Sequence, residues 1–227
     1  HANKSGRTAL IHASHNGHTE IVQHLLQALQ VANADVVPAA INHANNDSYT
    51  ALIWASNNGH LEIVKLLLQA LRDAGADIQA AVNHQSADSY TALIGASVNG
   101  HTDIIRLLLR ALRDAGAGMS AALNHQDSNG MKVLTRASGM GNIDVIQLLL
   151  QTLRDAGEDM QAALNHQDAD GWTGLIAASY DGYTDIVRLL LQALHDAGAD
   201  IQEELNHQDN HGNTALMWAS ENNHTET

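Results

Sequence analysis

The chain has 227 residues, 44% of them apolar, and its 25 acidic against 11 basic residues give a formal net charge of −14. This negative charge repels phosphate backbones and anionic lipids, which makes nucleic acids and membrane surfaces poor partners and a basic protein surface a better one. There is no Cys for a disulfide or a thiolate metal site, and no run of about 18 apolar residues that could cross a membrane.

The apolar residues are of a kind that favours helices. Ala, Leu, Ile and Val supply almost all of them, and the chain has no Phe and a single Pro. Sheet sandwiches favour β-branched and aromatic residues, whereas a core of Ala and aliphatic side chains suits closely packed helices. We therefore expect an all-α protein. No secretory signal peptide is visible within the chain, and we expect a cytoplasmic protein, with a targeting segment outside this chain left open as the alternative.

Two short motifs recur along the chain with one period. The tripeptide Thr-Ala-Leu, or a variant of it, begins at Thr8, Thr50, Thr91, Lys132, Thr173 and Thr214, with spacings of 42, 41, 41, 41 and 41 residues. The dipeptide Asn-His keeps the same period, with its histidines at His43, His84, His125, His166 and His207. Two independent markers with a common period indicate a solenoid of repeats. We predict one array over residues 1–227, in the register 1–41 (partial), 42–82, 83–123, 124–164, 165–205 and 206–227 (partial).

Each repeat begins with two helices joined by a turn. In the unit that starts at Thr50, small and aliphatic residues over 50–57 predict a short helix, and Asn-Asn-Gly-His supplies turn chemistry. Residues 61–74 place Ile, Val and Leu at spacings that form one broad apolar face, which predicts a longer second helix. Gly75 then provides the left-handed residue that ends it.

A third, shorter element and a projecting turn complete the repeat. Asp77 precedes Ile-Gln-Ala-Ala-Val, which predicts a helical turn over 77–82 with an Asp at its N-cap. The polar stretch 83–90 predicts a turn or hairpin, which we call the finger of the following repeat. Ser48 and Ser89 occupy the finger position that holds Gly in later repeats, so the sequence leaves the geometry of these two fingers open.

These motifs resemble the ankyrin repeat. Asp168-Ala169-Asp170-Gly171-Trp172-Thr173 is similar to the family's turn, Gly59-His60 and Gly100-His101 to its Gly-His, Leu66-Leu67-Leu68 to its Leu run, and Gly75-Ala76-Asp77-Ile78 to its Gly-Ala-Asp-Ile. The resemblance covers essentially the whole chain. It implies an all-α ankyrin-repeat solenoid with projecting finger turns. The usual unit has about 33 residues, so we place the excess in an extended second helix and in an extra helical turn per repeat.

Both ends of the chain interrupt a repeat. His1 aligns with His43 inside a finger, and the last residues align with the approach to a second helix. Terminal repeats usually present a polar outer face that ends the stack, and neither end has that pattern. We therefore expect this chain to be a fragment of a longer protein.

Motifs for catalysis or metal binding are missing from the sequence. There is no phosphate loop, nucleophile elbow or His-Glu-x-x-His string. The Asn-His histidines repeat once per unit, and packed helices lie about 8–10 Å apart, too far for neighbours to share a zinc ion at about 2 Å. We expect these rings to bond finger backbone instead. The sequence therefore predicts no enzyme activity, catalytic residue, metal, cofactor or small-molecule substrate.

The positions that vary between repeats mark the candidate binding surface. They lie just before the Thr, two residues after the Leu, and after the Ser at the end of the first helix. In ankyrin repeats, these places correspond to the finger tips and the exposed side of the first helices, which line the concave groove where partners bind. Aromatic residues, Arg and Met are enriched in interface cores. The candidate partner-binding residues are Tyr49, Trp54, Asn57, Tyr90, Val98, Met131, Arg136, Met140, Trp172, Tyr180, Asp181 and Trp218.

Three functions are compatible with this pattern. The first is a non-catalytic protein–protein interaction module that binds a partner protein or peptide through the groove. The second is a structural spacer or a self-associating array, in which the aromatic rings only pack between fingers. The third is the recognition domain of a larger effector enzyme whose catalytic part lies outside this chain.

Overall fold

The computed structural model describes residues 1–32 and 36–224, and its contacts divide the chain into two compact units, His1–Ala122 and Leu123–Thr227. The helices of unit 1 are α1 (Ala9–His15), α2 (Thr19–Ala32), α3 (Val37–Ile41), α4 (Ala51–Asn57), α5 (Leu61–Asp73), α6 (Ile78–Val82), α7 (Ala92–Val98) and α8 (Thr102–Asp114). Helix α9 (Met119–Leu123) lies at the boundary between the units. Those of unit 2 are α10 (Val133–Ser138), α11 (Ile143–Asp155), α12 (Met160–Leu164), α13 (Gly174–Tyr180), α14 (Thr184–Asp196), α15 (Ile201–Leu205) and α16 (Ala215–Glu221).

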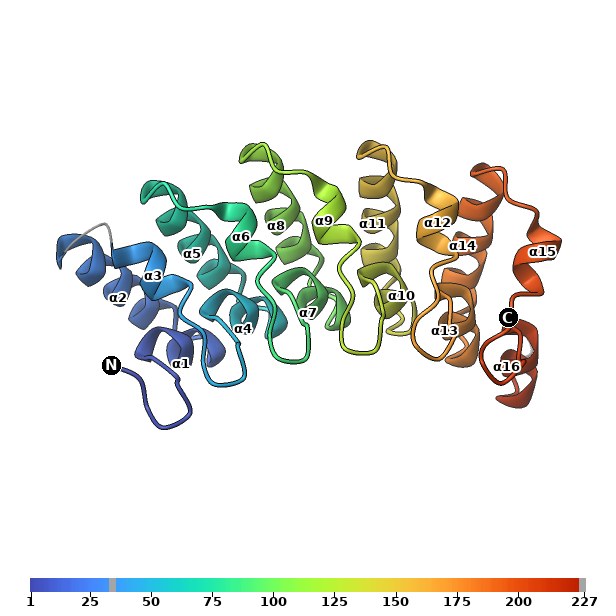
Figure 1. Cartoon of the computed structure of the whole chain (residues 1–227), viewed down its shortest axis with the longest axis horizontal. Helices are drawn as coiled ribbons and strands as arrows, with labels where there is room; N and C mark the ends of the chain where they lie inside the picture. Colours follow the sequence, from blue (N-terminus) through green and yellow to red (C-terminus); the bar gives the residue numbers. More distant parts are fainter. Residues whose placement is uncertain (33–35, 225–227) are drawn as a thin grey trace. The chain divides into compact units, whose positions relative to one another are not determined.

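The repeat has the predicted sequence of elements: a finger, a short first helix, a long second helix and a third helix of five residues. Figure 1 shows the fingers as loops that project beside the first helices. The described residues form no strand, only two isolated bridges at the bases of fingers. The all-α architecture is therefore confirmed. The third helix, α6 for example, is the extra turn that the sequence predicted, and the second helices α5, α8, α11 and α14 each have 13 residues.

The Thr of the repeated tripeptide begins each first helix. The Thr50 Oγ1 accepts a hydrogen bond from Ile53 N at 3.3 Å, and Thr173 does the same for Ile176 N. Such N-caps satisfy a backbone donor that the helix itself leaves free. Lys132 has no such side-chain bond, and α10, which follows it, is one residue shorter than α13.

The Gly-His motif explains how neighbouring repeats pack. Gly17 has φ +77°, and a Cβ at this position would lie only 2.7 Å from an atom of the His60 ring in the next repeat. The ring nitrogen Nε2 of His60 lies 3.2 Å from His15 O. In unit 2, Tyr183 lies against Gly141 in the same way. The Gly is therefore required twice, once for its backbone conformation and once for the space that the next repeat fills.

Aliphatic side chains from all three helices form the core. Ile53, Leu67 and Leu71 are fully buried in unit 1, as are Ile146 and Leu149 in unit 2. The described side chains include all seven Trp and Tyr residues, and none of these rings belongs to the buried core. The aromatic rings therefore lie at half-buried or exposed positions, outside the aliphatic interior.

An Asx-type turn builds each finger. In the finger that ends at Thr50, Asn45 Oδ1 accepts hydrogen bonds from Asp47 N at 3.1 Å and Tyr49 N at 2.8 Å. Ser48 and Ser89 adopt φ +60° and +58°, the conformation that Gly130 and Gly171 adopt in unit 2. The two Ser fingers therefore form the same turn as the Gly fingers, although this conformation is unfavourable for a residue with a Cβ.

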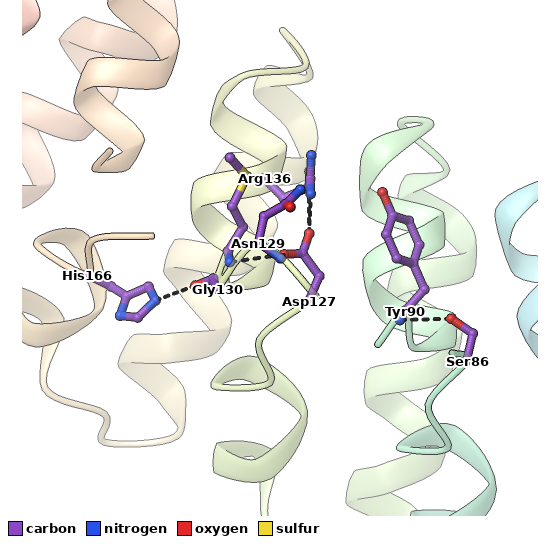
Figure 2. Close-up of polar contacts among 8 residues, drawn as sticks. Ser86, Tyr90, Asp127, Asn129, Gly130, Arg136 and His166 are labelled. Carbon is purple, nitrogen blue, oxygen red and sulfur yellow. Dashed lines mark hydrogen bonds and ion pairs between the residues drawn. The ribbon is translucent and has the colours of Figure 1, made fainter. Parts of the chain in front are cut away.

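Three of the repeated histidines bond finger backbone, as the sequence predicted. The Nε2 atoms of His43, His84 and His166 lie 2.9, 3.0 and 2.8 Å from Gly6 O, Ser48 O and Gly130 O of the preceding fingers. Figure 2 shows the His166 contact. His207 differs, because its Nδ1 lies 3.6 Å from the buried carboxylate of Glu204. The histidine series is thus mainly a device that fixes one finger against the next.

Candidate partner-binding face

The variable residues of the fingers and first helices form a surface that we call the finger face. All twelve candidate residues are half-buried or exposed, and none is fully buried. Met140 and Tyr180 are the most accessible of the apolar ones, at 40% and 38% exposed.

In unit 1, four side chains from two repeats meet at Trp54. Tyr49 stacks on Trp54 with ring centroids 4.6 Å apart, and His15 meets the same ring edge-on at 4.4 Å. The Arg7 guanidinium lies over the Trp54 ring, 5.3 Å from its centroid, in a cation–π contact. We call Arg7, His15, Tyr49 and Trp54 the first cluster. Two of its members, Tyr49 and Trp54, are predicted site residues.

In unit 2, three predicted residues meet in a second cluster, defined as Trp172, Tyr180 and Trp218. Trp172 lies 5.0 Å from Tyr180 and 5.7 Å from Trp218, and Tyr180 lies 5.3 Å from Trp218. The rings are tilted or edge-on to one another, which are favourable arrangements for aromatic pairs. Trp172 comes from a finger, Tyr180 from α13 and Trp218 from α16, so the cluster joins two successive repeats.

The finger aspartates of unit 2 bind donors on the first helices. Asp127 Oδ1 accepts from the Asn129 and Met131 backbone, while its Oδ2 accepts from Arg136 Nε at 3.0 Å and from the Arg136 terminal amino group (Figure 2). Asp209 Oδ2 likewise accepts from Trp218 Nε1 at 2.9 Å. Arg136 and Trp218 are predicted site residues whose polar atoms thus support the finger. This pairing was not predicted from the sequence, although acceptor and donor are nine residues apart in both repeats.

Two other repeats have the same positions without a matching pair. We call the residue that corresponds to Asp127 and Asp209 the finger residue. In the unit 1 repeat that contains Trp54, the finger residue is Asn45. Asn45 Nδ2 and Trp54 Nε1 are both donors, and neither has a partner among residues 1–32 and 36–224. In unit 2 the finger residue Asp168 precedes Ala177, which has no polar side chain. Asp168 is 9% exposed, and its Oδ2 is buried without a hydrogen-bond partner in the described part of the chain.

Burial and hydrogen bonding shift several acidities on this face. Partial burial raises the pKa of Asp181 and of the Tyr49 hydroxyl and lowers the pKa of His15. Burial alone would raise the pKa of Asp209. The hydrogen bonds that its carboxylate accepts from Asn213 N, Trp218 Nε1 and His211 N outweigh burial and lower this pKa. Asp209 therefore stays ionised in the folded protein at neutral pH.

The remaining predicted residues lie outside the two clusters. Asn57 accepts a hydrogen bond from Asn99 Nδ2 at 3.2 Å and packs near Gly95 of the next repeat. Backbone donors of Tyr90 and Met131 bond their own finger residues, Ser86 and Asp127. Val98 is half-buried, and Asp181 and Met140 are exposed.

The two units carry very different charges. Unit 1 contains seven Lys and Arg against nine Asp and Glu, whereas unit 2 contains four against sixteen. The net charges are therefore −2 and −12, and unit 2 carries most of the chain's total of −14. Histidines are counted as neutral here.

The described residues contain no helix that is long and apolar enough to cross a membrane. Within the same residues, no three His, Cys, Asp or Glu side chains are grouped so that they could hold a metal ion.

Comparison with known proteins identifies the family. A model of ankyrin repeats, three copies long, matches residues 1–81, 71–162 and 151–227. Among solved structures, the crystal structure of EF0377, an ankyrin repeat protein, is similar to this chain with a TM-score of 0.69 and 29% sequence identity, over 99% of this chain and 96% of that one. No curated protein sequence matches the chain. The chain belongs to the ankyrin-repeat family, whose members are generally protein–protein interaction modules and typically not enzymes.

Proposed function

We propose that this chain is a non-catalytic binding module that holds a partner protein or peptide on its finger face. One observation carries the proposal. Six of the seven Trp and Tyr residues lie at the variable positions of fingers and first helices, and none of them is part of the buried aliphatic core. Trp and Tyr, which combine a large apolar ring with a polar atom, are among the residues that contribute most to protein interfaces.

The clustering of these rings supports binding over a spacer role. Rings that only covered the core would be needed equally in every repeat. They are instead concentrated at Tyr49 and Trp54 in unit 1 and at Trp172, Tyr180 and Trp218 in unit 2, where Trp218 contacts the other two rings across repeats. Binding energy at interfaces is likewise concentrated in a few central residues.

The test compares three immobilised proteins: the wild type, a finger-face variant and a matched control. The finger-face variant carries Trp54→Ala, Trp172→Ala and Trp218→Ala. The control carries Glu62→Ala, Gln151→Ala and Gln192→Ala, which alter exposed positions on the second helices α5, α11 and α14. Circular dichroism and thermal melts first establish that all three are folded.

Each protein is then exposed to the same cell lysate, and the retained proteins are identified by mass spectrometry. The proposal predicts a partner that the wild type and the control retain and the finger-face variant loses. Equal retention by all three folded proteins would contradict binding through the finger face, and loss only in the control would move the site to the second helices.

A further inference from the structure

The two aromatic clusters occupy the same register in their repeats. Arg7 and Trp172 both stand just before the Thr, Trp54 and Trp218 both stand two residues after the Leu, and His15 and Tyr180 both follow the Ser. In the first cluster the chain supplies its own cation, because Arg7 lies over the Trp54 ring. In the second cluster the corresponding residue is Trp172, so three aromatic rings meet there.

A buried negative charge lies beside the second cluster. Trp172 N donates to Asp168 Oδ1 at 2.8 Å, which holds this carboxylate against the backbone of a cluster residue. The other carboxylate oxygen is buried and has no partner among the described residues. In the preceding repeat the corresponding carboxylate, Asp127, has Arg136 as its counter-ion. Ala177 stands at the position of Arg136, so this position provides no cation for Asp168.

We propose that the second cluster is the binding site, here called the cation seat, for a cationic side chain, Arg or Lys, of the bound partner. This inference rests on the proposed function of the finger face. A cation over the rings gains a cation–π contact, and it also compensates the buried charge of Asp168. Exposed Asp181, the residue after Tyr180, adds a further carboxylate. With four basic against sixteen acidic residues, unit 2 also has a negative electrostatic potential that attracts a basic segment.

The buried carboxylate of Asp168 favours a cation over an apolar side chain at this cluster. An apolar group would also cover the three rings, but it would leave Asp168 buried without a counter-ion, which is unfavourable. Arg7 over Trp54 shows that the same register accommodates a guanidinium above an aromatic ring.

The experiment titrates the protein with N-acetyl-arginine methylamide and, separately, with its neutral isostere N-acetyl-citrulline methylamide. The chain has three Trp residues, so the three indole N–H signals in a ¹H–¹⁵N spectrum report on both clusters once single Trp→Phe variants assign them. Arginine is expected to shift the Trp172 and Trp218 signals and to leave Trp54 unchanged. Citrulline is expected to bind at least about fivefold more weakly, since a cation–π contact is lost.

Two variants make the test specific. Asp168→Asn removes the buried charge, and Asn45 shows that Asn forms this turn, so the variant is expected to fold and to prefer arginine over citrulline less strongly than the wild type, because only the cation–π contribution remains. Arg7→Ala removes the internal cation from the first cluster, and the Trp54 signal should then respond to arginine. Equal shifts with arginine and citrulline in the wild type, or an arginine preference that Asp168→Asn leaves unchanged, would overturn the inference.

The outcome is separable from that of the proposed function. If neither probe shifts Trp172 or Trp218 while the finger-face variant still loses its captured partner, the cation seat is wrong and the binding face stands. If arginine shifts both signals and no captured protein depends on the finger face, the cation seat is retained and the proposed function fails. An N-acetyl-lysine methylamide titration then establishes whether the seat prefers the guanidinium or the ammonium group.

Discussion

Units 1 and 2 are built from the same repeat but differ in the charge of the finger residue. In unit 1 the fingers begin with Asn3, Asn45 and Ser86, which carry no charge. Unit 2 has Asp127, Asp168 and Asp209 at the corresponding positions. Two of these aspartates bind a donor on the first helix, from Arg136 and Trp218. Each finger therefore needs only one side-chain acceptor oxygen for its own backbone. The second polar atom, where there is one, can vary in charge and in hydrogen-bond partner.

The largest effect is expected where a paired charge is fully buried. The Asp127 side chain is 0% exposed and that of Arg136 only 14%. Arg136→Ala leaves this carboxylate without its counter-ion and should lower the free energy of unfolding of unit 2 by about 3–5 kcal/mol, measured by urea denaturation. The matched control is Arg154→Ala, because Arg154 pairs with Asp196 at 3.6 Å but is 45% exposed. Its loss should be less than about 1 kcal/mol, and equal losses would show that Arg136 acts through something other than the buried pair.

A smaller, stabilising effect is expected when the mismatch in unit 1 is repaired. Asn45→Asp replaces a buried donor by an acceptor, so Trp54 Nε1 gains the bond that Trp218 makes with Asp209. Unfolding of the variant should require about 1–2 kcal/mol more, because two unsatisfied polar atoms disappear. Differential scanning calorimetry at neutral pH measures the change. In a Trp54→Phe background the same substitution should give no gain, and a gain of equal size there would refute the pairing.

The Trp218–Asp209 bond should appear in the pH dependence of stability. The folded-state pKa of Asp209 is lowered, so Asp209 stabilises unit 2 above its unfolded pKa, near 3.9, and this contribution is lost as the pH falls through the lower folded value. Trp218→Phe removes one donor, which should raise the folded pKa of Asp209 and lower stability at pH 7 by about 1 kcal/mol. Carboxyl ¹³C titration measures the pKa. Trp172→Phe should leave it unchanged, and an unchanged pKa in Trp218→Phe would contradict the bond.

The smallest effect is expected at the finger turn. Ser48 has φ +60°, where Gly130 of unit 2 has φ +74°. Ser48→Gly should raise the free energy of unfolding by about 0.5 kcal/mol and the thermal midpoint with it. The reason is that relief of the left-handed strain exceeds the cost of the added chain entropy. The reverse substitution, Gly130→Ser, should lower it by a similar amount. Thermal melts that move in the opposite directions would show that the two turns are not equivalent.

The period and the motifs were sufficient to predict the fold. Thr50 and Gly75 mark the ends of elements, and each of these signals acts within a few residues of its own backbone. The inserted turn at α6 was predicted for the same reason, because Asp77 precedes a short helical segment and its side chain accepts from Ala80 N at 2.9 Å. Local backbone chemistry determines these features, so they are readable from one repeat.

The candidate face could be predicted only as a set of positions. That Tyr49 and Trp54 stack, or that Trp172 contacts Trp218 forty-six residues later, depends on side-chain directions and on the distance between repeats. The buried state of Asp168 was also beyond the sequence analysis, because a finger aspartate looks the same whether or not a donor faces it. The pattern indicates which positions vary, and packing determines which of them act together.

The most direct test of the binding face places a photo-crosslinking residue, p-benzoyl-phenylalanine, at single positions of the full chain. Tyr49 and Tyr180 report on the finger face of units 1 and 2, and Gln69 and Gln192 on the exposed sides of α5 and α14. After irradiation in cell lysate, our account predicts that a common partner is linked from Tyr49 or Tyr180 and not from Gln69 or Gln192. Partner crosslinks from the two Gln positions, with none from the two Tyr positions, would contradict it.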